Sequence, residues 1–358
     1  MLCITPVEGF RNAKTGTLTM DRTEAGVHPA VPIQQVACGQ CMPCRITTQQ
    51  DLVTRCVHET IVNEKTRGSA IFATLTYRTE DLNERRELIP KDTQDFNKRV
   101  RSNVGPFRFL QAAEYGPGTL RPHHHYLAWF PETNWFEGAR KVRTGNFPLF
   151  EHPRLNELWG HGYIHFGRVD VGSARYVSNY TLKKSGYLDE IQGLKTGHRP
   201  NTFHREGPRT LIASGDDGYT RQWVETATGL PMTDTWEVQP EFQRRSTGRG
   251  DNRGLGHRFY TRHKEQIFGT AEHPNDNPFH IILTENGSSK TRVPAYYMDL
   301  LEKDDPELYD WHRERRKEVA KQQDRKWIKA GTTRAYQAQA ALVTKYDRMM
   351  LHYRPEHQ

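Results

Sequence analysis

The sequence predicts an α+β fold, in which an antiparallel sheet carries helices on one face and a C-terminal, mainly helical or irregular extension follows. The first observation is the order strand, helix, strand, strand between residues 71 and 130. The second is a turn-prone segment at 115–118, which would let the strands on either side pair as a hairpin. The third is a loss of periodic pattern near residue 186. We therefore expect an N-terminal region (1–66), a central domain (67–186) and a basic extension (187–358).

The individual elements follow from local patterns. Residues 1–37 have little periodicity and predict an irregular arm. Apolar residues from Arg45 to Asn63 recur at helical spacing, Ile71–Tyr77 is typical of a buried strand, and Asp92–Arg101 predicts a short basic helix. Residues 158–167 predict a further strand after a glycine-flanked turn. The helices would cover one face of the sheet and leave the other open.

Three consecutive histidines open the most informative strand. After Arg121-Pro122, the run from His123 to Phe130 is rich in residues that suit a half-buried pleated surface. Successive side chains of a strand alternate between faces, so His123 and His125 would lie side by side and His124 on the opposite face. Glu114 ends the preceding strand-like run and would lie near them. Two imidazoles and one carboxylate predict an open Mg²⁺ or Mn²⁺ site that can polarise a phosphodiester oxygen.

A helix is predicted from Ser173 to Lys184, with Ser173 as its N-cap. Tyr176 and Tyr180 are four residues apart and would share one face, about 6 Å apart along the axis. Lys183 or Lys184 would continue that face. Two phenols and a cation beside a metal suit a nuclease in which a tyrosine attacks a phosphate. The alternative is that the tyrosines are core contacts and the lysines a solvated helix end.

The cysteines predict a structural metal site. Cys38, Cys41 and Cys44 have the C-x2-C-x2-C spacing that suits a tetrahedral ion such as Zn²⁺. We expect Cys3 to be the fourth ligand, because Cys56 lies on the apolar stripe of the next helix and is more simply a core residue. The alternative is a set of reduced cysteines that bind no metal.

Composition limits the classes of function. The 358 residues carry a formal charge of +8, which favours an anionic partner. We expect no membrane association, since no apolar run approaches the roughly twenty residues that span a bilayer and no signal peptide pattern is present. An odd number of cysteines argues against a secreted disulfide framework, so we expect an intracellular protein.

The extension contains a basic, glycine-containing stretch with interleaved aromatic residues. It includes Arg244, Arg245, Arg249 and Arg253, which we expect to contact a nucleic-acid backbone. A flexible, solvated loop is the alternative. Tyr296–Leu351 predicts two or more charged helices, including 310–329.

The histidine strand, the Tyr-x-x-x-Tyr helix with its lysines and the cysteine cluster together resemble the replication initiators of gokushovirus-type phages, small single-stranded DNA phages of the Microviridae. This family lies within the wider class of His-hydrophobe-His (HUH) rolling-circle endonucleases. The resemblance extends over roughly residues 1–185, and more faintly over 242–268 and 296–307. The sequence departs from the class at His124, where the class prefers an apolar or aromatic residue; strand alternation and the preceding Arg121-Pro122 favour His123 and His125 as ligands.

The resemblance implies an HUH endonuclease-like catalytic domain over 67–186 that nicks single-stranded DNA at the viral origin. A tyrosine would attack the phosphate, giving a 5′-phosphotyrosyl link and a 3′-hydroxyl primer. Strand transfer and religation would then circularise the genome. Tyr176 and Tyr180 would alternate, with Lys183 or Lys184 stabilising a phenolate or contacting the phosphate. The implied place of action is the cytoplasm of the host bacterium, with host replication proteins as partners.

Two other functions fit some of these patterns. A transposase or plasmid relaxase of the same chemical class would use the same metal pair, and a single essential tyrosine would favour it. A zinc-stabilised single-stranded DNA-binding protein without catalysis would use its tyrosines to stack bases.

Overall fold

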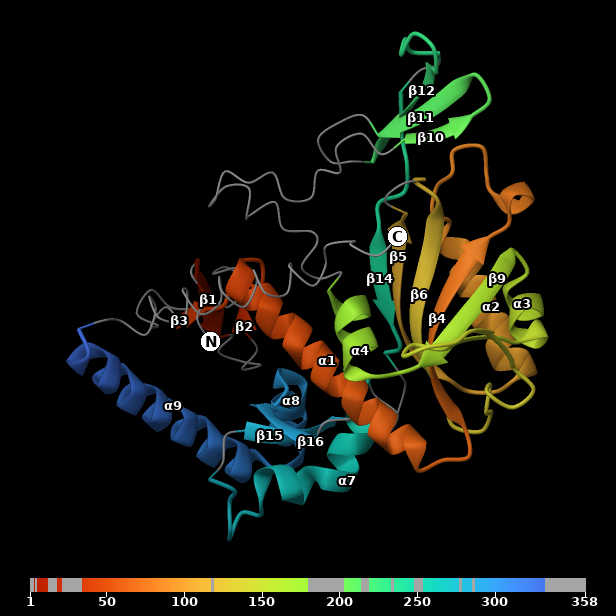
Figure 1. Cartoon of the computed structure of the whole chain (residues 1–358). Helices are drawn as coiled ribbons and strands as arrows, with labels where there is room; N and C mark the ends of the chain where they lie inside the picture. Colours follow the sequence, from red (N-terminus) through yellow and green to blue (C-terminus); the bar gives the residue numbers. More distant parts are fainter. Residues whose placement is uncertain are drawn as a thin grey trace.

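The computed structural model contains one large sheet with helices around it (Figure 1). It describes residues 3, 5–11, 18–20, 34–116, 119–179, 203–213, 219–232, 235–247, 254–276, 279–284 and 287–331. The large sheet has seven antiparallel strands in the order β14-β5-β6-β4-β9-β8-β7. These strands are β14 (Phe242–Arg245), β5 (Arg108–Tyr115), β6 (Pro122–Phe130), β4 (Ser69–Tyr77), β9 (Gly162–Arg168), β8 (Leu149–Glu151) and β7 (Arg140–Arg143).

The helices are distributed along the whole described chain. They are α1 (Met42–Glu64), the short 3-10 helix η1 (Thr79–Asp81), α2 (Pro90–Asn103), α3 (Pro153–Trp159), α4 (Val171–Ser178), α7 (His257–Phe268), α8 (Ala295–Asp304) and α9 (Pro306–Lys329). Three small sheets complete the fold. They contain β1 (Val7–Arg11), β2 (Leu18–Thr19) and β3 (Gln34–Val36); β10 (Phe203–Glu206), β11 (Arg209–Ala213), β12 (Thr220–Glu225) and β13 (Trp236–Glu237); and β15 (Phe279–Thr284) with β16 (Gly287–Arg292).

The predicted α+β class is confirmed, but the prediction that helices cover one face only is wrong. Helices α2 and α3 pack on one face of the large sheet, where Phe96 and Trp159 meet Tyr126. On the other face α1 and α4 pack against Leu127 and Trp129. The central strands β5 and β6 are buried at almost every position, because both faces are covered. The histidine-bearing face is therefore not an open one.

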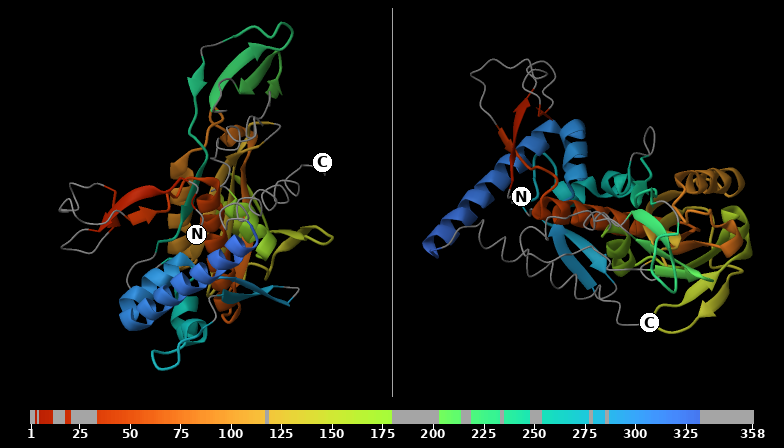
Figure 2. Two further views of the ribbon diagram at one scale, coloured as in Figure 1. Left: turned by 90° about the vertical axis from the view of Figure 1, so that its left-hand side faces the viewer. Right: turned by 90° about the horizontal axis from the view of Figure 1, so that it is seen from above.

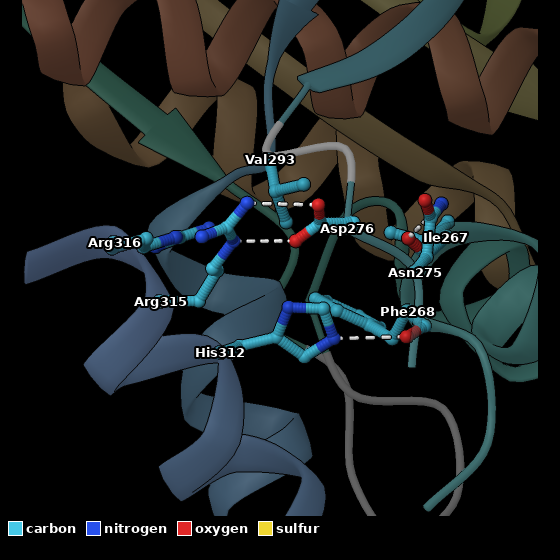
Figure 3. A pocket seen from close by; sticks show the side chains of 8 residues that line it. All are labelled: Ile267, Phe268, Asn275, Asp276, Val293, His312, Arg315 and Arg316. Carbon is cyan, nitrogen blue, oxygen red and sulfur yellow. Dashed lines mark hydrogen bonds and ion pairs between the residues drawn. The ribbon is translucent and has the colours of Figure 1, made fainter. Parts of the chain in front are cut away.

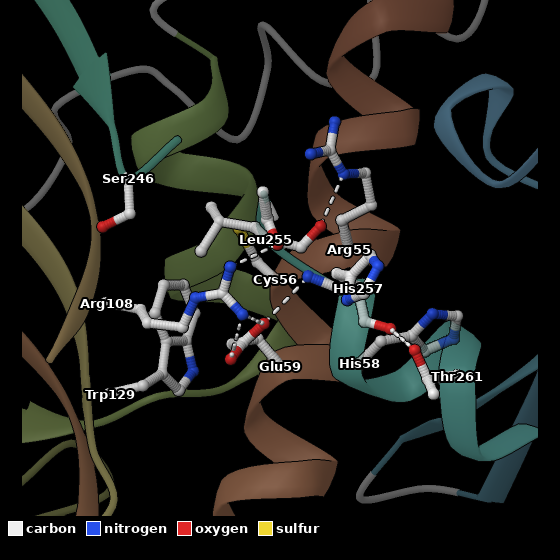
Figure 4. Close-up of polar contacts among 12 residues, drawn as sticks. Arg55, Cys56, His58, Glu59, Arg108, Trp129, Ser246, Leu255, His257 and Thr261 are labelled. Atoms are coloured by element: carbon white, nitrogen blue, oxygen red, sulfur yellow. Dashed lines mark hydrogen bonds and ion pairs between the residues drawn. The ribbon is translucent and has the colours of Figure 1, made fainter. Parts of the chain in front are cut away.

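Helix α1 is the main link between the large sheet and the rest of the chain. It is 23 residues long and packs on β4, β6, α4 and α7. Near its C-terminal end, Glu59 forms a buried ion pair with Arg108 of β5, at 3.3 Å (Figure 4). The Glu59 carboxylate also accepts a hydrogen bond of 2.8 Å from the amide of Gly256, just before α7. One carboxylate therefore fastens α1, the sheet and α7 together.

The C-terminal helices form a separate cluster around α7. Tyr297, Leu301 and Leu308 are fully buried there against Phe268. His312 of α9 is hydrogen-bonded to the carbonyl of Phe268 at 2.8 Å, and Arg315 pairs with Asp276 (Figure 3). These contacts hold α9 by its first half, and the charged helices predicted after residue 296 are present as α8 and α9.

The expectation of a mainly helical or irregular extension is wrong between residues 203 and 245. Strands β10 to β13 form a four-stranded sheet that projects from one end of the molecule (Figures 1 and 2). Strand β14 then joins the large sheet by pairing with β5. The signal was weak because these strands have two to six residues and place arginines among apolar residues, including the buried Arg221.

The three predicted regions remain a prediction, but the pairing of β14 bears on any attempt to separate them. A fragment that ended at residue 186 would lose an edge strand of the large sheet. Among the described residues, no helix combines the length and the apolar character needed to cross a membrane.

Replacement of Glu59 tests the role of the buried ion pair. We expect Glu59→Ala to lower the free energy of unfolding by about 3–5 kcal/mol, since it leaves the buried Arg108 guanidinium without its carboxylate. Urea denaturation followed by circular dichroism measures this. Glu157→Ala, at an exposed position of α3, should change stability by less than about 0.5 kcal/mol. Equal effects of the two substitutions would contradict the assigned role.

Candidate active site

The structure brings Glu114, His123 and His125 together. Glu114 lies directly opposite His123 in the ladder between β5 and β6, and His125 follows on the same face. One ligand atom from each of the three side chains lies within 4.8 Å of the others. Glu114 and His125 are 3% and 7% exposed, whereas His123 is half-buried. Two imidazoles and a carboxylate converging at this distance suit a divalent cation, and the half-buried side leaves room for a substrate.

Neighbouring groups fix the orientation of both imidazoles. Nδ1 of His123 donates a hydrogen bond to the Arg121 carbonyl at 3.2 Å, which in the neutral ring leaves the lone pair on Nε2. Nδ1 of His125 lies 3.0 Å from the Thr74 hydroxyl. Thr74 is opposite His125 in the ladder between β4 and β6, so its position follows from strand register. Sequence reasoning missed both partners, because register between distant strands cannot be read from local pattern.

Tyr176 is the tyrosine that the structure places at this group. Its phenol oxygen is 3.2 Å from Nε2 of His125, and the two rings meet edge to face at 4.9 Å. The Phe72 ring lies 5.9 Å away from Tyr176 on the other side. The phenol therefore contacts the nitrogen of His125 that points away from Thr74.

Helix α4 holds Tyr176 in this place. The helix begins at Val171 with Asp170 as its N-cap, so the prediction of Ser173 as N-cap is wrong. Ser173 instead completes a capping box: its amide donates to Asp170 and its hydroxyl accepts from the Asp170 amide at 2.9 Å. At the other end of the helix, Gln243 of β14 donates to the Val177 carbonyl at 2.9 Å.

The other predicted members of the tyrosine helix lie outside the described residues. These are Tyr180, Lys183 and Lys184. Their placement one turn and two turns beyond Tyr176 stays a prediction.

His124 points to the opposite face and has a different environment. It is fully buried, 3.2 Å from the Tyr77 hydroxyl and 3.4 Å from the Gln111 amide nitrogen. Tyr77 donates its own proton to Asp92, so Nε2 of His124 must donate to the Tyr77 oxygen. Burial lowers the pKa of His124 to about 3, and nearby positive groups, including His123, lower it further. This neutral, internally bonded imidazole is directed away from Glu114.

The four cysteines expected to bind metal also converge. Sulfurs of Cys3, Cys38, Cys41 and Cys44 lie within 4.8 Å of one another at the start of α1. Backbone amides and the Thr5 hydroxyl point at Cys38, and the Thr5 hydrogen bond is the main reason that the pKa of its thiol falls to about 6. Burial raises the pKa of Cys44 to about 12. Cys56 is fully buried in the core against the sheet, as predicted.

The arginines expected to contact nucleic acid are only partly described. Arg244 stacks over Phe242 and donates to the Pro90 carbonyl, so its side chain is engaged within the protein. Arg245 is exposed at the end of β14. Arg249 and Arg253 lie outside the described residues.

Comparison with known proteins agrees with this arrangement. A family model for the replication-associated protein ORF2 matches residues 70–185, which include the histidine strand and both tyrosines. Replication-associated protein VP4 of Bdellovibrio phage phiMH2K is 27% identical over 64% of this chain and 73% of its own length. Replication-associated protein ORF4 of Chlamydia phage 1 is 26% identical over 53% of this chain and 48% of its own length. No solved structure was a significant match. The chain is thus a relative of the replication initiators of gokushovirus-type phages, as its motifs predicted.

Metal titration tests which histidines act together. We expect His123→Ala and His125→Ala to weaken Mn²⁺ binding more than about tenfold, because each removes one of three ligands. His124→Gln should keep wild-type affinity, since its ring faces the other side of the sheet. Electron paramagnetic resonance of free Mn²⁺ measures the affinities, with circular dichroism to verify folding. Loss of binding in the His124 variant alone would contradict the assignment.

Proposed function

We propose that this protein initiates rolling-circle replication by nicking single-stranded DNA through attack of a tyrosine on a phosphodiester. The observation that carries the proposal is the Tyr176 phenol, 3.2 Å from His125 within a group of two histidines and one glutamate. A nucleophile and a cation site in contact are what phosphoryl transfer to a tyrosine requires. The relatedness to phage replication-associated proteins supports the same function.

Glu114, His123 and His125 would hold the divalent ion. When bound, Mg²⁺ or Mn²⁺ would draw negative charge from the scissile phosphate. The residues around the site perform the positioning. Thr74 and the Arg121 carbonyl hold the two imidazoles, and the capping box of α4 fixes the direction of Tyr176.

The transfer itself is balanced without another reactant. The phenol oxygen forms a bond to phosphorus, the bond from phosphorus to the 3′ oxygen breaks, and the phenol proton ends on the released 3′-hydroxyl. This hydroxyl primes replication, while the 5′ end stays on the tyrosine. Because the phosphotyrosyl link keeps the energy of the broken bond, a later 3′-hydroxyl can reverse the step and close the circle.

Tyr180 extends the proposal to a two-tyrosine exchange. If α4 continues by one turn, Tyr180 follows Tyr176 on the same face and can cut the next junction while Tyr176 holds the first end. Lys183 or Lys184 would contact the phosphate or stabilise the phenolate. The DNA is the viral origin in the host bacterium, where host replication proteins would extend the primer.

The cysteine group has a structural part in this proposal. Four sulfurs at the start of α1 suit Zn²⁺, which would anchor the N-terminal strands to the helix that packs on the sheet. No residue of the cysteine group belongs to the cluster of Glu114, His123 and His125.

Tyrosine variants test the chemistry. Purified protein, Mn²⁺ and circular single-stranded phage DNA should give a covalent protein–DNA adduct that survives denaturation. The adduct should persist in Tyr176→Phe or in Tyr180→Phe and vanish in the double variant, because one phenol suffices for one cut. If one tyrosine alone proves essential, a transposase or relaxase mechanism is favoured. No adduct from any form, with DNA binding intact, would support a non-catalytic DNA-binding protein.

Metal analysis tests the cysteine group. We expect about one Zn²⁺ per wild-type chain by plasma mass spectrometry. Cys41→Ser and Cys44→Ser should lose it and unfold at lower temperature, since each removes a thiolate ligand. Cys56→Ala is the matched control, because this core cysteine lies outside the group. Zinc-free wild-type protein with unchanged melting would contradict the proposal.

A further inference from the structure

A large cavity lies at the opposite end of β5 from Glu114. It has a volume of about 670 Å³ and is bounded by α1, the start of β5, the end of β6, the segment after β14 and the first turn of α7. This volume lies within the range of about 300–1,000 Å³ that is usual for ligand pockets. The cavity is distinct from the site of Glu114, His123 and His125, none of which lines it.

The lining of the cavity is strongly positive. Four arginines line it, and Glu59 is its only carboxylate among the described residues. Glu59 is already bound by Arg108 at 3.3 Å and by the Gly256 amide at 2.8 Å (Figure 4). The charges of Arg101, Arg245 and Arg258 therefore exceed the negative charge of the lining.

Two of these arginines are available to a ligand. Arg101 and Arg245 are exposed, and within the described part of the chain no carboxylate lies at ion-pair distance from either. The Arg101 guanidinium stacks 5.1 Å from the Phe107 ring, which fixes its direction. Burial lowers the pKa of Arg245, and the nearby Arg55 charge lowers it further, so positive charge is crowded here. An anion would relieve this crowding.

The cavity also lies on a path from the metal site. Arg108 and Glu114 are on the same face of β5, six residues apart, which corresponds to about 20 Å. The edge strand β14 runs between the two ends: Phe242 pairs with Ala113 and Arg245 pairs with Leu110. A nucleic-acid strand that left the metal site along β14 would reach the cavity.

We propose that this cavity is a second phosphate-binding site, which holds the backbone of single-stranded DNA at a distance from the bond that is cut. The inference rests on the proposed function, because the DNA substrate supplies the phosphate. Phe107, Phe109 and Trp129 are buried and offer no free ring to a base. The contact is therefore to phosphate alone and does not depend on base sequence.

The test compares an Arg101→Gln/Arg245→Gln double variant with Arg143→Gln as control. Both changed positions are exposed, so the fold should persist, and Arg143 is an exposed arginine of β7, at the other edge of the sheet. Binding of fluorescent single-stranded oligonucleotides is measured by anisotropy over a series of salt concentrations. We use one long oligonucleotide and one that reaches only the metal site.

For the long oligonucleotide, the salt dependence of the double variant should be shallower by about 1.4 in the log–log slope, since about 0.7 is lost per phosphate contact. The loss should be the same for different base sequences, and the short oligonucleotide should bind as it does to the control. Equal slopes for the double variant and the control would overturn the proposal.

Two further arms separate the alternatives. If thymidine monophosphate binds the wild type, binds the double variant more weakly, and the long oligonucleotide binds both equally, the cavity is a nucleotide site and the DNA assignment is wrong. Adduct formation is measured separately, with wild-type protein and the short oligonucleotide. Its failure, with the slope difference intact, would remove the nicking chemistry and leave the phosphate site in place.

Discussion

Glu114 lies opposite His123 in the ladder between β5 and β6, and the candidate chemistry depends on this register. A shift by one residue would turn the Glu114 carboxylate to the face that holds His124, and the three ligand atoms would no longer converge. The same ladder system places Thr74 beside His125 on the other side. Backbone hydrogen bonds between three strands therefore determine which groups can share one cation.

Burial on both faces of the sheet fixes that register. Leu127 and Trp129 pack under α1 and α4, while Tyr126 and Phe130 pack under α2 and α3, so neither set of side chains can exchange faces without exposing apolar surface. Helix α1 adds the ion pair of Glu59 with Arg108 at one end. Nearer its start, Gln49 donates to Asn179 at 2.6 Å, directly after α4. The helix thus restrains both the sheet and the tyrosine helix.

Local pattern was sufficient to predict the groups whose members lie on one strand or a short loop. Alternation separated His124 from its two neighbours, the turn at 115–118 brought Glu114 to them, and cysteine spacing with one distant partner gave the sulfur group. Contacts between distant segments were beyond it. Thr74, the strand β14 and the second helical layer depend on register and packing, which a periodic pattern does not encode. Asp170 was missed as N-cap because Ser173 is an equally good candidate by residue type.

The central claim is that His123, His125 and Glu114 hold one cation in contact with Tyr176. Anomalous diffraction at the manganese edge, from crystals grown with Mn²⁺, tests it most directly. The account predicts a single strong peak at about 2.2 Å from one nitrogen of each histidine and from a Glu114 oxygen, with the Tyr176 phenol beside it. A peak elsewhere, or none between these residues at saturating Mn²⁺, would contradict it.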